Sequence, residues 1–131
     1  MGILLSAPVR IAVAVTAMID LGIGLAFFFS PELSVTLWTS PVSPTLSRFI
    51  GAIIIGNGVG AALIARLGTW ESARVLFTVA LVYGVIVMLG LLYHFMHGDL
   101  PSALLIYLGV DVVFLVPIGF IYWRYEQGKP I

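Results

Sequence analysis

Apolar residues run along the chain in four long stretches, separated by short groups of polar, glycine and proline residues. The stretches cover about residues 8–29, 46–66, 73–95 and 101–123. Each has room for the ~20 residues that a helix needs to cross a bilayer. The pattern therefore predicts an all-α integral membrane protein, a four-helix transmembrane bundle that forms one domain over residues 1–131.

The connections between the predicted spans carry residues typical of helix boundaries. Ser30, Pro31 and Glu32 fit a helix start, with a hydroxyl cap, a proline in the first turn and an acid beside it. The segment after them is short, semi-apolar and carries Trp38, a residue that favours the headgroup level. We therefore expect a short interfacial helix between the first two spans. Gly68 is expected to end the second span as its C-cap.

Residues 1–29 also invite comparison with a secretory signal peptide. No Lys or Arg precedes Arg10, Asp20 interrupts the apolar run, and no suitable small-residue cleavage site follows Phe29. These features favour a first membrane span over a cleaved leader.

Positive residues are distributed unevenly between the two sides that four spans define. One side holds the N-terminus, the connection between the second and third spans, and the C-terminus. Five of the 6 cations lie on this side: Arg10, Arg66, Arg74, Arg124 and Lys129. The positive-inside rule then predicts that both termini lie in the cytoplasm. Residues 122–125 are expected to form an aromatic and basic belt on that side.

Composition agrees with lipid as the solvent of this chain. Hydrophobic residues make up 61% and charged residues only 9%, with a mean hydropathy of +1.16, whereas a soluble domain carries roughly 25% charged residues. The net charge of zero gives no indication of a nucleic-acid partner. The chain has no cysteine, which excludes disulfides and thiolate metal sites.

The second span carries small residues at four-residue spacing, namely Ala52, Gly56 and Gly60. This GxxxG spacing allows two helix backbones to approach closely. We expect the face to pack against another span of the same chain, with a second subunit as the alternative. The glycines around Gly56 do not form a dinucleotide fingerprint, because no strand precedes them and they lie inside an apolar span.

Asp20, Asn57 and Asp111 each lie roughly 13–18 Å from the ends of their spans, close to one level near the bilayer midplane. A carboxylate there costs about 3 kcal/mol, so it should face the bundle interior or a wet cavity. One interpretation is a site for a polar ligand head, a cation or a transferred proton. The other is that protonated acids join helices through hydrogen bonds to Asn57, Thr78 or Tyr83.

The opposite side carries a smaller group of candidates. Arg48 is expected either to bind an anionic headgroup, to pair with Glu32 or Asp99, or simply to extend along the interface. His94 and His97 are spaced to share one helix face beside Asp99, which is a weak metal-site pattern. Two histidines without a third fixed ligand favour a polar interfacial turn, and the sequence requires no metal or other cofactor.

The residues "FFFSPE" after the first span and "SRFIGAIIIGNGVG" in the second resemble the DoxX-like group of small bacterial four-helix membrane proteins and related uncharacterised groups. The matching features are Pro31 after the first span and Arg48 and Gly51 at the start of the second. The resemblance implies the fold and a location in the bacterial cytoplasmic (inner) membrane. DoxX itself is associated with quinol-oxidising or redox-partner membrane complexes, but this sequence has no cysteine or cofactor motif that would carry that role over.

No catalytic set is evident in the sequence, which favours a non-enzymatic accessory or interaction subunit that holds a lipid or quinone. Its expected partners are the bilayer, other membrane subunits or a second copy of the chain. The alternative is a small proton-coupled transporter or carrier that uses Asp20 and Asp111. A third interpretation, an intramembrane enzyme or redox subunit, would use His94, His97 and Asp99.

Overall fold

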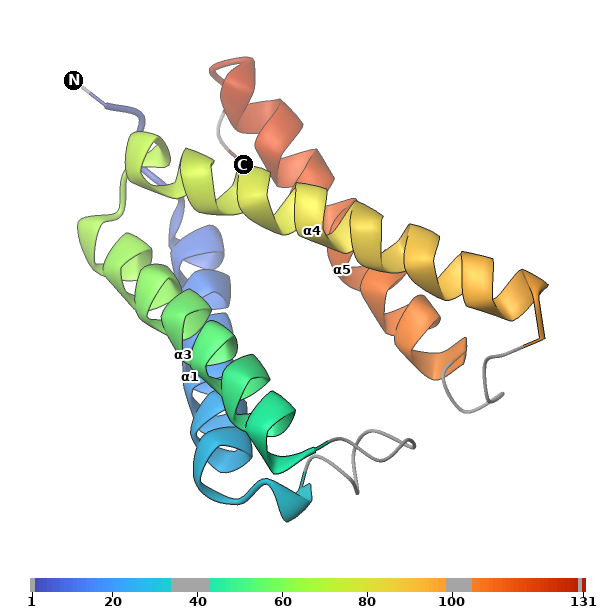
Figure 1. The fold of residues 1–131 in the computed structure, drawn as a ribbon. Helices are drawn as coiled ribbons and strands as arrows, with labels where there is room; N and C mark the ends of the chain where they lie inside the picture. The colour runs from blue at the N-terminus through green and yellow to red at the C-terminus, as the bar shows by residue number, and fades with distance from the viewer. Residues whose placement is uncertain (1, 34–42, 99–104, 130) are drawn as a thin grey trace.

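The computed structural model describes residues 2–33, 43–98, 105–129 and 131. These residues form four α-helices (Figure 1): α1 (Ala7–Phe29), α3 (Pro44–Leu67), α4 (Trp70–Met96) and α5 (Leu105–Glu126). Each of them is long and apolar enough to cross a membrane. The prediction of an all-α chain with four apolar spans is thus confirmed.

The ends of these helices follow from local residues. The Ser43 hydroxyl accepts a hydrogen bond from the Leu46 N–H at 3.2 Å, and Pro44 occupies the first turn, so α3 begins there. Gly68 adopts a left-handed φ of 67° and donates to the Ile64 carbonyl at 2.8 Å, which confirms it as the C-cap of α3. The predicted interfacial helix falls mainly on residues 34–42, outside the described residues.

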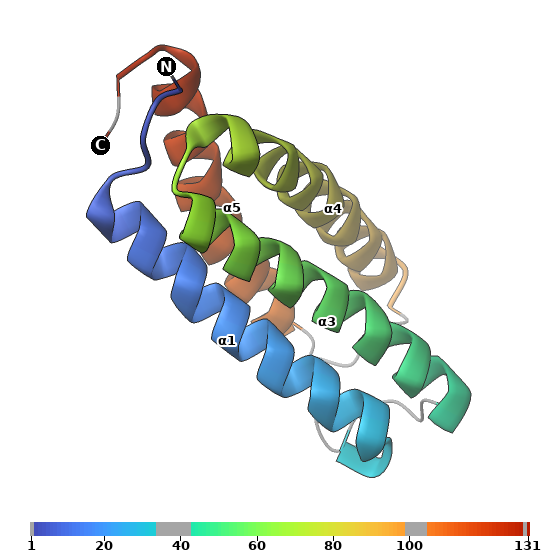
Figure 2. The same cartoon turned by 90° about the vertical axis from the view of Figure 1, so that its left-hand side faces the viewer.

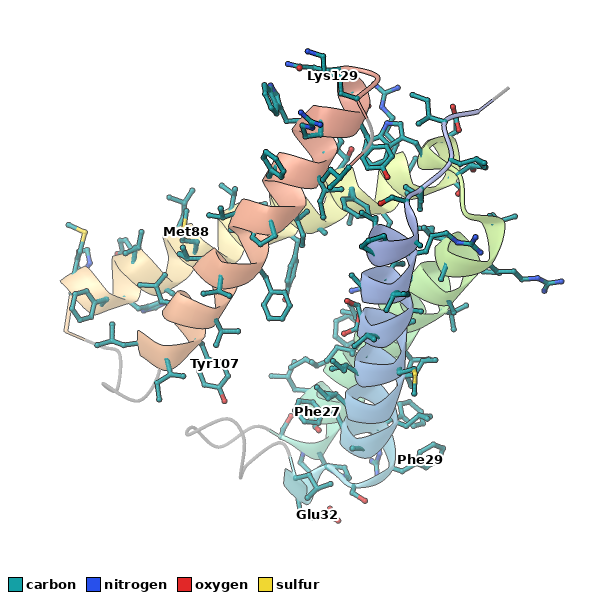
Figure 3. The ribbon with its side chains drawn as sticks, turned by 180° about the vertical axis from the view of Figure 1, so that it is seen from behind. Phe27, Phe29, Glu32, Met88, Tyr107 and Lys129 are labelled. Atoms are coloured by element: carbon teal, nitrogen blue, oxygen red, sulfur yellow. The ribbon has the colours of Figure 1, made fainter. Side chains whose placement is uncertain are left out.

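The helices associate as two pairs, in which α1 lies along α3 and α4 lies along α5. Figure 2 shows α1 and α3 side by side along their lengths. The pairs meet at the end of the molecule that holds both termini, and they diverge from there toward the other end (Figures 1 and 3). The described part of the fold is therefore two helix pairs joined at one end.

Glycine brings α1 and α3 into backbone contact. A Cβ atom on Gly51 would lie 2.8 Å from both the Gly24 carbonyl oxygen and the Phe28 nitrogen. One on Gly58 would lie 3.0 Å from the Leu21 nitrogen. Side chains larger than hydrogen would push the two backbones apart, so this close pairing depends on glycine.

The small-residue face predicted from the sequence is not the face of α3 that contacts α1. Ala52 and Gly56 are exposed, and a Cβ atom on Gly56 would meet no described atom within 4 Å. A Cβ atom on Gly60 would meet Leu76 of α4 at 3.7 Å, an ordinary contact. The expectation of close packing within the chain through Ala52, Gly56 and Gly60 is therefore wrong for the described residues. Contact of this face with a second subunit stays a prediction.

A cluster of buried side chains lies where the two pairs meet. Its members are Leu5, Val9, Val13, Ala17, Ala61, Ile64, Trp70, Ala73, Phe77 and Tyr125. The Trp70 ring stacks on Tyr125 with 5.1 Å between centroids and makes edge contacts with Phe77 and Tyr122 at 5.6 and 5.5 Å. Such aromatic pairs each contribute about 0.5–1.5 kcal/mol beyond the area they bury. We call this group the junction cluster.

Tyr125 corrects the predicted aromatic belt. Its side chain is only 1% exposed, and its hydroxyl accepts a hydrogen bond from the Ser6 N–H at 2.8 Å. Trp123, two residues earlier, is 54% exposed and fits the belt. The end of α5 therefore has one face in the junction cluster and one face outward.

Backbone hydrogen bonds tie the N-terminal segment to the connection between α3 and α4. The Leu5 N–H donates to the Gly68 carbonyl at 2.8 Å, and the Trp70 N–H donates to the Ile3 carbonyl at 2.7 Å. The Arg10 guanidinium donates twice to the Ala65 carbonyl, at 3.0 and 3.2 Å. It thereby satisfies a carbonyl that the end of α3 leaves without a helical partner.

Candidate functional site

The three polar residues predicted near the midplane share one register relative to the junction cluster. Asp20 lies seven residues after Val13 on α1, and Asn57 lies seven residues before Ile64 on α3. Seven residues are about two helical turns, or about 10 Å, and return to nearly the same helix face. Each polar side chain therefore continues the face that enters the cluster, two turns further from it.

Asp111 has the same relation to the cluster on α5. It lies seven residues before Ile118, which packs against the cluster. Tyr107, one turn beyond it, points toward the space between the pairs in Figure 3. The two carboxylates thus lie at similar heights, Asp20 on one helix pair and Asp111 on the other.

Hydrogen bonding does not join these polar groups to one another. Both aspartates are half-buried and Asn57 is exposed. The Asp111 Oδ2 atom is buried and has no hydrogen-bond partner among the described residues. Thr78, a partner considered for the acids, donates instead to the Arg74 carbonyl of its own helix at 2.8 Å. In the described residues, the alternative of hydrogen-bonded acids between helices therefore has no direct contact to support it.

The charged groups of the described chain leave these carboxylates without a counter-ion. The ion pair found among the described residues joins Arg74 to Glu126 at 2.9 Å, at the junction. Arginine and lysine otherwise lie at the helix ends and beyond them. Intramembrane carboxylates in such surroundings need a proton, water or a ligand to satisfy their oxygens.

An apolar groove of about 280 Å³ lies on the α4–α5 pair. Its lining residues are Leu81, Val85, Met88, Val112, Leu115 and Val116. Leu115 lies close against Gly84 of α4 and is one turn from Asp111. The groove therefore offers hydrocarbon surface next to a carboxylate that has an unsatisfied oxygen.

The residues predicted on the opposite side do not come together as a site. Arg48 is exposed and makes no ion pair with Glu32 in the described chain. The His97 and Tyr93 ring centroids lie 4.2 Å apart, and the His97 Nδ1 atom is 2.8 Å from the Tyr93 carbonyl oxygen. The His94 ring makes a T-shaped contact with the Tyr93 ring, with 5.6 Å between centroids. The described residues contain no group of three or more potential metal ligands, and Asp99 lies outside them.

The junction is not evident from the sequence, because each helix end is interpreted there on its own. Trp70 follows the predicted cap at Gly68 and Tyr125 falls within the predicted belt, whereas both side chains are buried together. Aromatic residues three apart, Tyr122 and Tyr125, share one helix face, and that spacing is the signal that indicates a packed end.

Fold and composition define a class, a small integral membrane protein of apolar helices. No protein-family model matches the chain, and comparisons with curated proteins and with solved structures find no match. The function is therefore inferred from the residues and their geometry.

Proposed function

We propose that this protein is a non-enzymatic accessory or interaction subunit of a membrane complex, and that it holds a lipid or quinone against the α4–α5 pair. The observation that carries the proposal is the apolar groove beside Asp111, whose Oδ2 atom is buried without a partner. A hydrocarbon tail would lie on Leu81, Val85 and the neighbouring groove residues. The head would reach the carboxyl group.

The chemistry of Asp111 suits either form of a quinone head. A protonated carboxyl group donates a hydrogen bond, as a quinone carbonyl requires, and an ionised one accepts from a quinol hydroxyl. The ionised carboxylate would accept a hydrogen bond from a lipid hydroxyl or amine in the same way. Because no described cation neutralises Asp111, binding such a head also lowers the cost of keeping a polar group inside the bilayer.

Location and partners follow from the same features. The excess of cations at the end with both termini supports a bacterial cytoplasmic membrane protein with cytoplasmic termini. The layout around Pro31 and Arg48 supports membership of the DoxX-like group. The exposed face with Ala52 and Gly56 supports contact with another subunit or a second copy.

Native mass spectrometry of the protein in a mild detergent tests the binding role. We expect a lipid or quinone to remain bound to the wild-type chain. Val112→Trp should expel it because Val112 lines the groove, whereas Val113→Trp, at the adjacent position 69% exposed and outside the groove, should retain it. A wild-type chain without bound lipid or quinone, or equal retention by both variants, would refute the role.

The second candidate is a proton-coupled carrier, favoured by the two unpaired carboxylates on opposite helix pairs. Such a carrier would move protons across the membrane of liposomes, and both Asp20→Asn and Asp111→Asn would abolish the flux. A binding subunit produces no flux in the wild type. A pH-sensitive dye inside the liposomes separates the two functions.

A further inference from the structure

Side-chain charge is concentrated at the junction end of the molecule. The cations there are Arg10, Arg66, Arg74, Arg124 and Lys129, against the carboxylates Glu71 and Glu126. Hydrogen bonds among the N-terminal segment, the α3–α4 connection and the end of α5 hold these residues at one end. Figure 3 shows Lys129 at this end and Glu32 at the opposite end.

The two carboxylates at this end are already engaged by the fold. Glu126 accepts a hydrogen bond from the Trp70 indole at 3.0 Å and pairs with Arg74 at 2.9 Å. Glu71 accepts from the Ile3 N–H at 3.3 Å and lies against Gly2. Neither acid neutralises the remaining cations.

Arg66, Arg124 and Lys129 are consequently without an ion pair among the described residues. Arg66 and Lys129 are exposed, and the half-buried Arg124 has no hydrogen-bond partner for its Nε atom in the described chain. Arg66 is in the last turn of α3 and Arg124 in the last turn of α5. These positions are where helices that cross the hydrocarbon core reach the phosphate level, with the arginine stems along apolar surface.

We propose that the junction end binds anionic phospholipid headgroups through Arg66, Arg124 and Lys129. The partner is lipid because two of these cations belong to the ends of apolar helices and are therefore held at headgroup depth. Trp123, exposed beside Arg124, places an aromatic ring at the same level. This surface is separate from the groove on α4 and α5, so its test is independent of the proposed ligand there.

Tryptophan quenching by brominated lipid measures the preference. Trp38, which lies outside the described residues, is replaced by phenylalanine. Trp70 and Trp123 then remain as the reporters, and both lie at the junction end. The protein is reconstituted in mixtures of phosphatidylglycerol and phosphatidylcholine, with bromine on one lipid at a time. We expect phosphatidylglycerol to be preferred at low salt, and the preference to decline as salt is raised.

The variants locate the preference. Removing each cation should lower the ratio of phosphatidylglycerol to phosphatidylcholine binding by up to about fivefold. The double variant of the two exposed residues, Arg66→Gln with Lys129→Gln, should therefore lower this ratio strongly, even if Arg124→Gln impairs folding. Arg48→Gln, at the opposite end, is the matched control and should leave the ratio unchanged. A ratio near one in the parent protein, an unchanged ratio in the double variant, or an equal loss with Arg48→Gln would overturn the proposal. Displacement of the lipid by inorganic phosphate, beyond that by chloride of equal ionic strength, would instead indicate a site for soluble anions and would also overturn it.

Discussion

Replacing Gly51 by alanine tests the close α1–α3 contact. The added Cβ atom would lie 2.8 Å from the Gly24 carbonyl oxygen and from the Phe28 nitrogen. Both are backbone atoms, so no side-chain rotation relieves the overlap and the helices must separate. Overpacking of this kind costs typically about 1–3 kcal/mol. The higher helix propensity of alanine offsets at most about 1 kcal/mol of that loss.

The same separation would weaken a hydrogen bond one turn away. The buried Ser47 hydroxyl donates to the Phe27 carbonyl at 3.0 Å, and a Cβ atom on Gly51 would lie 3.2 Å from the carbon of that carbonyl. Hydrogen bonds between membrane helices average about 0.6 kcal/mol. We therefore expect Gly51→Ala to lower the free energy of unfolding by about 1–3 kcal/mol in total.

Unfolding in mixed micelles with increasing SDS, followed by far-UV circular dichroism, provides the measurement. Gly22→Ala is the matched control, because it adds the same methyl group to the partner helix α1 at a position where no described atom lies within 4 Å. The control should be unchanged or more stable by up to about 1 kcal/mol. Equal unfolding midpoints for Gly51→Ala and the wild type, or equal destabilisation by both variants, would refute the assigned contact face.

Three further substitutions examine other contacts by the same unfolding assay. Ser47→Ala should cost about 1 kcal/mol because a carbonyl at the end of α1 loses its partner; no change in midpoint would contradict this. Tyr125→Phe should cost a similar amount and accelerate hydrogen exchange at the Ser6 amide, whereas unchanged exchange would show that the bond is absent. Gly68→Ala should cost about 1–2 kcal/mol because its φ is 67°. It should cost more than Gly98→Ala, which has a φ of 73° but no described atom within 4 Å, and the reverse order would argue against the crowded site.

The helices themselves could be predicted from the sequence because their length and apolarity are dictated by the bilayer. The cap at Gly68 could also be predicted, since a left-handed residue after an apolar run favours glycine. Which glycines contact the neighbouring helix could not be predicted. Gly51, Gly58, Gly56 and Gly60 lie in the same span and are chemically identical. Which of them contact another helix depends on the surface of that helix, and the spacing within one span does not specify that surface.

Which helices pair with each other could not be predicted from the sequence either. In lipid, an apolar residue is as stable against an acyl chain as against a neighbouring helix, so hydrophobicity does not distinguish a packed face from an exposed one. Tyr125 shows the consequence. At the end of an isolated span it fits an interfacial belt, and only the Ser6 amide and the Trp70 ring, distant in sequence, make it a buried residue.

The position of the polar residues follows from how the helix pairs are joined. The junction cluster fills the space where the two pairs meet. Val13 and Ile64 belong to this cluster, and Ile118 packs against it. Two turns outward the pairs have diverged, and the same faces carry Asp20, Asn57 and Asp111. A polar group there avoids the tight apolar packing of the cluster yet does not face lipid on every side. Because Asp20 and Asn57 lie on the closely paired helices α1 and α3, and Asp111 lies on α5 of the other pair, a change in the junction would move Asp111 relative to the other two polar groups.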